Sequence, residues 1–151
     1  MIRPASEADL ATIRHIVRTT IETVYPQYYP AGAVAFFLSH HNDEAIRQDL
    51  AAGCVYLCAD DTQIIGTVTI RENEILRLFV LPECQGKGYG RELLDFAEQA
   101  VREQYPVIRI DASFAAKSIY LKRGYKETEY HKIRTENGDF LCYDVMLKEE
   151  D

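Results

Sequence analysis

Three glycines occupy alternate positions, Gly86, Gly88 and Gly90, with Lys87 between the first two, directly before a segment of helical periodicity. A loop that enters a helix exposes unpaired backbone amide hydrogens, and the helix dipole adds partial positive charge at the same place. Because glycine has no Cβ atom, an anion can approach this backbone closely. The segment therefore predicts an anion-binding loop, with a tight turn that binds nothing as the alternative.

The spacing of these residues can be compared with two known phosphate-binding motifs, the P-loop and the dinucleotide-binding fingerprint. A P-loop requires Ser or Thr after the lysine and a glycine where Leu81 stands, so that motif is excluded. A dinucleotide-binding fingerprint requires glycine or alanine where Arg91 stands. Asp111 nevertheless follows at about the distance of the ribose-binding acid in that motif, roughly 20 residues on. A nicotinamide-dependent oxidoreductase therefore stays as an alternative function.

Neither the histidines nor the cysteines stand in a pattern that binds a metal. His40 and His41 are adjacent and point to different sides of a helix, and no carboxylate or cysteine stands at ligand spacing. The cysteines are Cys54, Cys58, Cys84 and Cys142. Their spacing matches no zinc or redox motif, so we expect reduced packing residues, of which Cys84, beside the glycine loop, is open to thiol reagents.

The composition is that of an ordinary globular chain, with 151 residues of which 47% are hydrophobic and 27% are charged. No linker or repeat divides the sequence, so we expect a single domain over residues 1–151. The net charge of −7 argues against nucleic-acid binding and is compatible with a cationic ligand such as an amine. No apolar run in the sequence is long enough for a membrane span, and we expect a cytoplasmic protein.

The elements that must position the loop follow from hydrophobic periodicity and from capping residues. The expected helices are residues 6–25, 31–39, 42–53, 90–104 and 113–123. The expected strands are residues 2–3, 55–59, 64–71, 74–80, 107–110, 130–134 and 140–146. Short links join the three strands from 55 to 80 into an antiparallel meander.

Two connections determine the fold class. The glycine loop and the following helix connect strand 74–80 to strand 107–110 as a crossover. At the end of the chain, Asn137 and Gly138 favour a type I′ turn between two antiparallel strands. The expected fold is therefore α+β.

A long segment resembles the core motif of the Gcn5-related N-acetyltransferase (GNAT) superfamily, in which a strand, a proline and the pattern Q/R-x-x-G-x-G/A precede a helix. That segment is LRLFVLPECQGKGYGRELLDFAEQA, residues 76–100, in which the pattern is filled by Gln85, Gly88 and Gly90. The second signature of the family resembles SFAAKSIYLKRGY, residues 113–125, with matching residues Ala116, Tyr120, Gly124 and Tyr125. The resemblance implies a three-layer fold with a mixed, mostly antiparallel central sheet, a splayed parallel strand pair and flanking helices.

The resemblance implies acetyl-CoA as co-substrate and no metal. The pantetheine arm would lie between strands 74–80 and 107–110 like an added strand, and the pyrophosphate would lie on the glycine loop. The implied cofactor-binding residues are Leu78, Phe79, Val80, Gln85, Gly86, Lys87, Gly88, Tyr89, Gly90, Arg91, Ser113 and Ala116. Family members often have Asn where this chain has Ser113, which puts a contact to the cofactor there in doubt.

The implied chemistry is attack of a neutral amine on the thioester carbonyl. Tyr120 is then the expected acid for the departing thiolate, the backbone N–H of Val80 the oxyanion donor, and Glu74 a candidate base that acts through water. The region after the first helix would form the wall of the amine site. Its candidate substrate-binding residues are Tyr25, Tyr28, Tyr29 and Phe36, whose rings could attract an ammonium group.

These observations predict an acetyl-CoA-dependent N-acetyltransferase that acts on a primary amine of a small molecule or peptide. The alternative is a CoA-binding sensor or interaction module without catalysis. Packing of these four aromatic residues at a homodimer interface is a further expectation. The sequence leaves the identity of the amine open, because the residues of that wall follow no transferable code.

Overall fold

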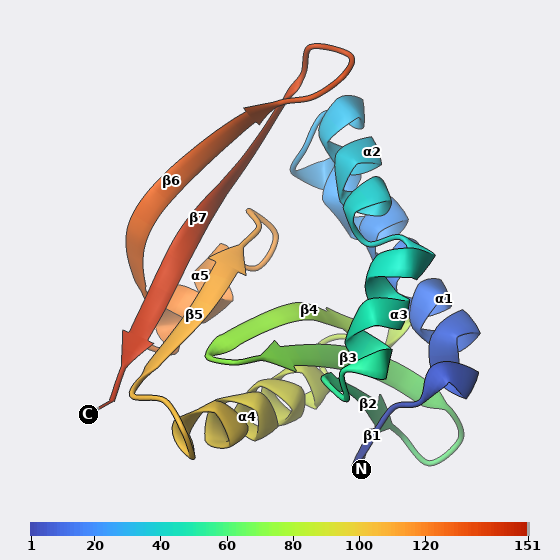
Figure 1. Ribbon diagram of the computed structural model, residues 1–151. Helices are drawn as coiled ribbons and strands as arrows, with labels where there is room; N and C mark the ends of the chain where they lie inside the picture. The colour runs from blue at the N-terminus through green and yellow to red at the C-terminus, as the bar shows by residue number, and fades with distance from the viewer. Residues whose placement is uncertain (151) are drawn as a thin grey trace.

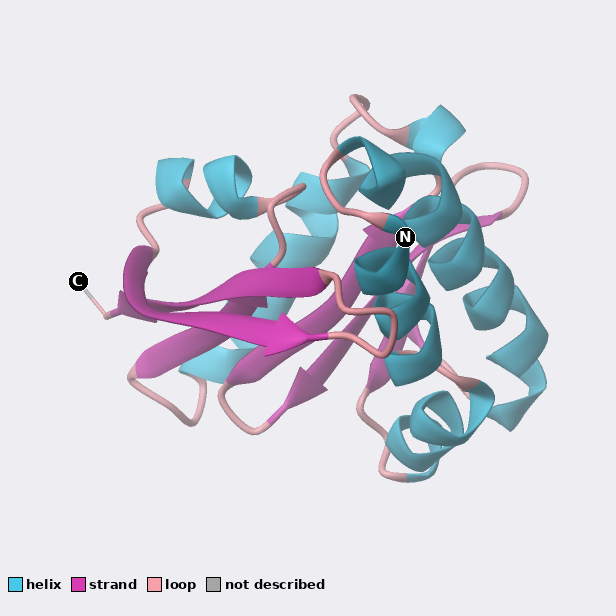
Figure 2. Ribbon diagram, turned by 90° about the horizontal axis from the view of Figure 1, so that it is seen from above, coloured by secondary structure: helices cyan, strands magenta, loops and turns pink. Residues whose placement is uncertain are grey.

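A seven-stranded sheet with the order β1-β2-β3-β4-β5-β7-β6 runs through the computed structural model, which describes residues 1–150 (Figure 1). The strands are β1 (Ile2–Pro4), β2 (Val55–Ala59), β3 (Ile64–Arg71), β4 (Glu74–Val80), β5 (Val107–Ala112), β6 (Lys126–Arg134) and β7 (Phe140–Glu149). The α-helices are α1 (Leu10–Val24), α2 (Ala31–His40), α3 (Asp43–Ala51), α4 (Tyr89–Arg102) and α5 (Lys117–Lys122). The mixed, mostly antiparallel sheet with flanking helices confirms the expected fold (Figure 2).

Helix α4 packs its apolar side against β3, β4 and β5. The residues it buries include Leu93, Leu94, Ala97 and Val101. The helix approaches β3 closely at Gly66, where a Cβ atom would lie 2.9 Å from the Leu93 Cδ1 atom and 3.2 Å from the Phe79 carbonyl oxygen. The crossover that carries the glycine loop is thus held directly on the centre of the sheet.

Strands β4 and β5 form the parallel pair, and they separate almost at once. Their register contains a single pair of residues, Glu74 opposite Arg109. Asn73 reinforces this end, because its carbonyl accepts from the Arg109 N–H at 2.9 Å and its side chain donates to the Val107 carbonyl at 3.1 Å. On its other edge, β5 pairs with β7 along its whole length, from Val107 to Ala112. The splayed strand pair is therefore confirmed.

A β-bulge interrupts β4 at Arg77. Val68 of β3 faces two residues of β4, because Thr67 pairs with Phe79 while Thr69 pairs with Leu76. Arg77 has a φ of +50°, in the left-handed region that is unfavourable for side chains of L-residues.

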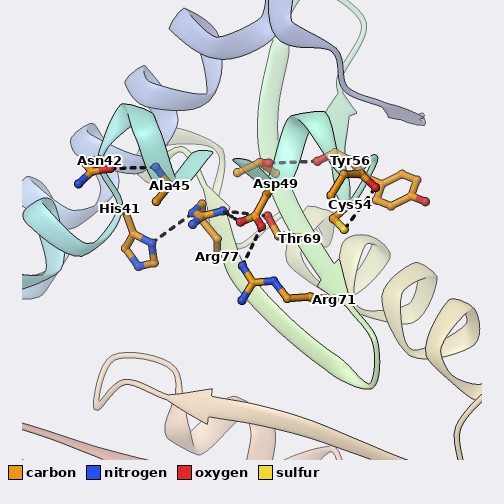
Figure 3. Close-up of polar contacts among 11 residues, drawn as sticks. His41, Asn42, Ala45, Asp49, Cys54, Tyr56, Thr69, Arg71 and Arg77 are labelled. Carbon is orange, nitrogen blue, oxygen red and sulfur yellow. Dashed lines mark hydrogen bonds and ion pairs between the residues drawn. The ribbon is translucent and has the colours of Figure 1, made fainter. Parts of the chain in front are cut away.

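The bulge is held by buried charge (Figure 3). The Arg77 Nη1 atom lies 2.7 Å from the Asp49 Oδ2 atom, with 3% and 6% of the two side chains exposed. Arg77 Nη1 also donates to the Thr69 hydroxyl at 3.3 Å, and the second Asp49 oxygen accepts from Arg71 at 2.7 Å. Burial opposes ionisation of Asp49, but the hydrogen bonds from Arg77 and Arg71 prevail and lower the pKa of the Asp49 carboxyl group.

Two local predictions were wrong. The fifth helix begins at Lys117, not at Ser113, because residues 113–116 form a turn in which the Ser113 carbonyl accepts from the Ala116 and Lys117 amides. Ile119, on this helix, is 55% exposed.

The final hairpin is confirmed, but its turn is not of type I′, which requires positive φ at both central residues. Of the two central residues, only Gly138 has positive φ, and the Thr135 hydroxyl donates a hydrogen bond to the Asn137 side chain.

None of the helices within residues 1–150 is both long and apolar enough to cross a membrane.

The buried ion pair of Asp49 and Arg77 generates a stability prediction. Asp49→Ala should lower the free energy of unfolding in urea by about 3–5 kcal/mol, because it leaves the Arg77 guanidinium buried without its partner. Arg71→Ala is the matched control: it removes the half-exposed partner of the same carboxylate and should cost less than about 1 kcal/mol. Equal losses in the two variants would contradict the assigned role of Arg77.

Candidate active site

The gap between β4 and β5 opens a cavity of about 700 Å³, which we call the loop cavity. Its lining includes Leu78, Phe79, Val80, Gln85, Gly86, Gly88, Gly90, Arg91, Ser113 and Ala116. Ten of the twelve expected cofactor-binding residues therefore meet around one space. Lys87 and Tyr89 do not line it; the side chain of Lys87 lies on the exposed surface of the loop.

The glycine loop owes its shape to backbone conformations that only glycine adopts easily. Gly86 and Gly88 have φ of +79° and +93°, and no atom lies within 4 Å of a Cβ position at either residue. The requirement at both positions is thus conformational and not a matter of space. Helix α4 begins directly after Gly88, so its first amide groups are directed at the loop cavity that Gly86, Gly88 and Gly90 line.

The end of β4 presents free backbone groups to the gap. Leu81 donates its N–H to the Ile65 carbonyl at 2.8 Å, and hydrogen-bonded pairs alternate along an antiparallel ladder. The N–H of Val80, one residue earlier, is therefore directed away from β3. The Val80 carbonyl is already occupied, because it accepts from the Gln85 side chain at 3.0 Å and from the Thr20 hydroxyl at 3.3 Å.

The same alternation corrects one expectation about β4. Phe79 is paired with Thr67 of β3, so its backbone groups belong to the ladder and cannot pair with a ligand in the gap. Its side chain still lines the loop cavity. Val80, the last of the three expected residues, directs its N–H to the gap but not its carbonyl.

A second cavity, of about 260 Å³, adjoins the loop cavity, and we call it the Glu74 cavity. The residues that line both cavities are Tyr25, Leu78, Phe79, Ser113, Ala116 and Tyr120. The two spaces therefore meet at the side chains of β4 and of the segment from Ser113 to Tyr120.

Tyr120 occupies this junction. Its side chain is 6% exposed, and its hydroxyl makes no hydrogen bond within residues 1–150. Burial, with a smaller contribution from the nearby Tyr25, raises the pKa of the Tyr120 hydroxyl well above its usual range. The phenol is therefore protonated at neutral pH and available as a hydrogen donor to both cavities.

Glu74 lines the second cavity from the start of β4. Burial and the negative charge of Asp111 raise the pKa of the Glu74 carboxyl group, and Arg109 and Arg71 oppose the shift. Arg109 is itself engaged with Asp111, at 3.0 Å from Nε to Oδ1. A carboxylate with a raised pKa is a better proton acceptor than an ordinary surface glutamate.

The four aromatic residues expected to contact a substrate separate into two pairs. Tyr25 and Phe36 line the Glu74 cavity, whereas Tyr28 and Tyr29 line neither cavity. Tyr28 is 49% exposed. Tyr29 is buried, and its hydroxyl donates to the Cys142 carbonyl at 2.9 Å and accepts from the Phe114 N–H at 2.8 Å. Its position does not fit the expected substrate contact, because both hydrogen-bonding directions are occupied within the protein.

Sequence reasoning missed the wall formed by His41, Arg77, Asp111 and Tyr143, all of which line the Glu74 cavity. His41 is half-buried and accepts a hydrogen bond from Arg77. No local pattern could have revealed this contact, since the two residues are 36 positions apart. Within residues 1–150, no three His, Cys, Asp or Glu side chains are arranged to hold a metal ion.

Comparison with known families places most of the chain in one of them. A family model described as an acetyltransferase (GNAT) domain matches residues 24–140. A curated relative, an uncharacterized N-acetyltransferase of Staphylococcus saprophyticus, is 39% identical over 57 residues. That match covers 38% of this chain and 36% of the relative, so the chain matches little more than a third of that protein's length.

Solved structures share the fold over nearly the whole chain. A GCN5-related N-acetyltransferase, aminotransferase class-II, from Rhodopseudomonas palustris has a TM-score of 0.89 at 21% identity, covering 99% of this chain and 94% of that one. The PaiA N-acetyltransferase from Thermoplasma acidophilum, solved in complex with coenzyme A, has a TM-score of 0.75 at 23% identity, covering 99% and 98%. At these identities the likeness establishes the fold alone.

The cysteines generate a prediction that replaces the expected reactivity of Cys84, which is only 5% exposed. In the native protein a thiol reagent should modify the half-buried Cys54 and Cys142 before the buried Cys58 and Cys84, because access limits the attack. Mass mapping of labelled peptides over time measures the order. Unfolded protein, in which all four free thiols should react together, is the control. Early labelling of Cys84 would contradict its burial.

Proposed function

The chain belongs to the GNAT acetyltransferase family, and from this premise we propose that it transfers an acetyl group from acetyl-CoA to a primary amine of a small molecule or peptide. The observation that carries the proposal is the meeting of two cavities at Tyr120. One cavity is bounded by the glycine loop and the other by carboxylates and aromatic rings. Two reactants can thus approach one point from opposite sides of the β4–β5 gap.

The loop cavity suits the cofactor. The backbone groups of Leu78 pair with the pantetheine arm, while amides at Gly86, Gly88 and Gly90 bind the pyrophosphate. Arg91 adds positive charge at the same place, and Lys87 acts from outside the cavity. The PaiA N-acetyltransferase of the same fold was solved with coenzyme A, which supports this assignment.

The reaction is direct attack of the amine nitrogen on the thioester carbonyl carbon. The carbonyl oxygen, which gains negative charge, accepts a hydrogen bond from the Val80 N–H. When the C–S bond breaks, the sulfur takes a proton from the Tyr120 hydroxyl, and the amine gives its proton through water to Glu74, which then releases it to the solvent. Tyr120 then regains its proton from the solvent.

The free energy needed to deprotonate the amine depends on its basicity. At pH 7, deprotonation of a lysine-like amine of pKa ~10.4 costs about 4.6 kcal/mol, whereas an α-amine of pKa ~8 costs about 1.4 kcal/mol. Glu74, with its raised pKa, is suited to accept that proton. A site with this single carboxylate base works best with an amine of low pKa.

Tyr120→Phe tests the proposal directly. The variant should release thiol from acetyl-CoA about 10²–10⁴-fold more slowly in the presence of a reactive amine, because the thiolate loses its proton donor. Binding of CoA, measured by calorimetry, should be retained. Tyr130→Phe is the matched control, since Tyr130 is 59% exposed and lines neither cavity. Saturable CoA binding without thiol release across an amine library would favour the alternative of a non-catalytic CoA-binding module.

Glu74→Gln tests the base through the pH dependence of kcat/KM. Because the pKa of Glu74 is raised, the wild-type rate should fall as pH decreases through that raised value and the carboxylate becomes protonated. The variant should have a lower kcat/KM at neutral pH and should lack the fall in kcat/KM that protonation of Glu74 causes. The fall in kcat/KM caused by protonation of the amine substrate should persist. Glu72→Gln, at an exposed neighbour outside both cavities, should keep the wild-type profile. Identical acidic limbs in wild type and Glu74→Gln would exclude Glu74 as the base.

A further inference from the structure

The imidazole of His41 presents one defined hydrogen-bonding group to the Glu74 cavity. Its Nδ1 atom accepts a hydrogen bond from the Arg77 Nε atom at 3.2 Å (Figure 3). A guanidinium group can only donate, so Nδ1 must hold a lone pair. In a neutral imidazole the hydrogen is then on Nε2. The remaining ring nitrogen of His41 is therefore an N–H donor and cannot accept a proton from a substrate.

The ring also stays neutral over the range in which an acetyltransferase works. Burial, followed by the positive charge of Arg77 and the proximity of His40, lowers the pKa of His41 to about 3. Arg77 cannot move away, because its other side is paired with the buried Asp49 at 2.7 Å. The tautomer of His41 is thus determined by a charge network that is itself buried.

The position of the ring is equally restricted. Its edge packs against the Phe79 ring, with centroids 5.7 Å apart and planes at 83°, and against His40 at 5.0 Å. No partner for Nε2 occurs among residues 1–150. A half-buried N–H donor that faces a cavity without a partner is best satisfied by an oxygen atom of a bound molecule.

The other groups of the cavity restrict what that molecule is. Glu74 and Asp111 line the same space; Asp111 is paired with Arg109, and the charge of Arg77, which also lines the cavity, is paired with Asp49. The carboxylate of Glu74 therefore attracts an ammonium or amine group and disfavours a substrate that carries a carboxylate. A volume of about 260 Å³ equals that of about nine water molecules at ~30 Å³ each, so only a small unit fits.

We propose that His41 is a specificity-determining residue whose Nε2–H binds a neutral oxygen of the amine substrate, and that this substrate is an α-amino amide. The same unit occurs in a free amino-acid amide and at the amino terminus of a peptide, where the first carbonyl supplies the oxygen. An α-amine also needs the least help from a base. The inference rests on the proposed acetyltransferase function and deepens it.

Two substitutions distinguish the Nε2–H donor of His41 from the hydrogen bond between His41 and Arg77. The side-chain oxygen of His41→Asn can replace Nδ1 as the partner of Arg77, but the shorter side chain places no N–H at the position of Nε2. The amide of His41→Gln reaches that position and restores a donor. His15→Gln, on the exposed side of α1, is the control. Circular dichroism and CoA binding establish that each variant is folded.

The experiment measures kcat/KM for alaninamide, for an alanine-led dipeptide amide, for alanine and for 3-methyl-2-butanamine, which matches alaninamide in shape but lacks the oxygen and the amide. The basicity of these amines differs, so the informative quantity is the change between variants in the ratio of the amide to the alkylamine. We expect His41→Asn to lower this ratio about tenfold and His41→Gln and His15→Gln to preserve it. Alanine should be a poor substrate throughout.

The outcomes distinguish failure of the inference about His41 from failure of the proposed acetyltransferase function. Equal loss of kcat/KM for amide and alkylamine in His41→Asn would mean that His41 only supports Arg77, and a wild-type preference for the alkylamine or for alanine would exclude an α-amino amide. Either result overturns the inference and leaves the acetyltransferase in place. Absence of turnover with every amine in the wild type would overturn both. If His41→Asn lowers the ratio as expected, the compound with the higher kcat/KM shows which substrate the site prefers: alaninamide indicates a free amino-acid amide, and the dipeptide amide indicates a peptide amino terminus.

Discussion

The left-handed backbone of Arg77 in the middle of β4 is the constraint on which the rest of the site depends. A non-glycine residue in that conformation costs roughly 1–2 kcal/mol, so something must hold it there. The buried ion pair with Asp49 of α3 does so, and it ties the bulge to a helix 28 residues earlier in the chain. Since a bulge bends its strand, β4 leaves β5 after a single pair of residues.

Everything that makes the site useful follows from this separation. Parallel strands that remained paired would use their backbone groups on each other and would leave no space between them. Here Val80 directs its N–H away from β3, and two cavities meet between β4 and the segment that leads to Tyr120. In the proposed reaction a cofactor and an amine approach from the two sides and react directly, without a covalent intermediate on the protein.

The same charge network links the bulge of β4 to the Glu74 cavity. Asp49 holds Arg77, and Arg77 determines which nitrogen of His41 carries the hydrogen. Replacing such a buried pair with apolar residues is often neutral for stability, so its presence here is better understood through what it orients. One network thus stabilises the bulge of β4 and defines a hydrogen-bond donor at the Glu74 cavity. A second buried carboxylate, Glu98 of α4, binds Arg123 and Tyr125 and anchors the segment after Tyr120.

Local features of this chain were determined by the sequence alone. The order of helices and strands, the meander from 55 to 80 and the place of the glycine loop directly before a helix depend on periodicity, caps and turn residues within a few positions, and these predictions were confirmed. Only the tertiary structure decided the bulge at Arg77, the outward face of Val80, the packing role of Tyr29 and the tautomer of His41. Each of these arises from partners far apart in the chain, such as Tyr29 and Cys142, which are 113 residues apart. Hydrogen bonds between such residues form only after the chain has folded, so no local pattern encodes them.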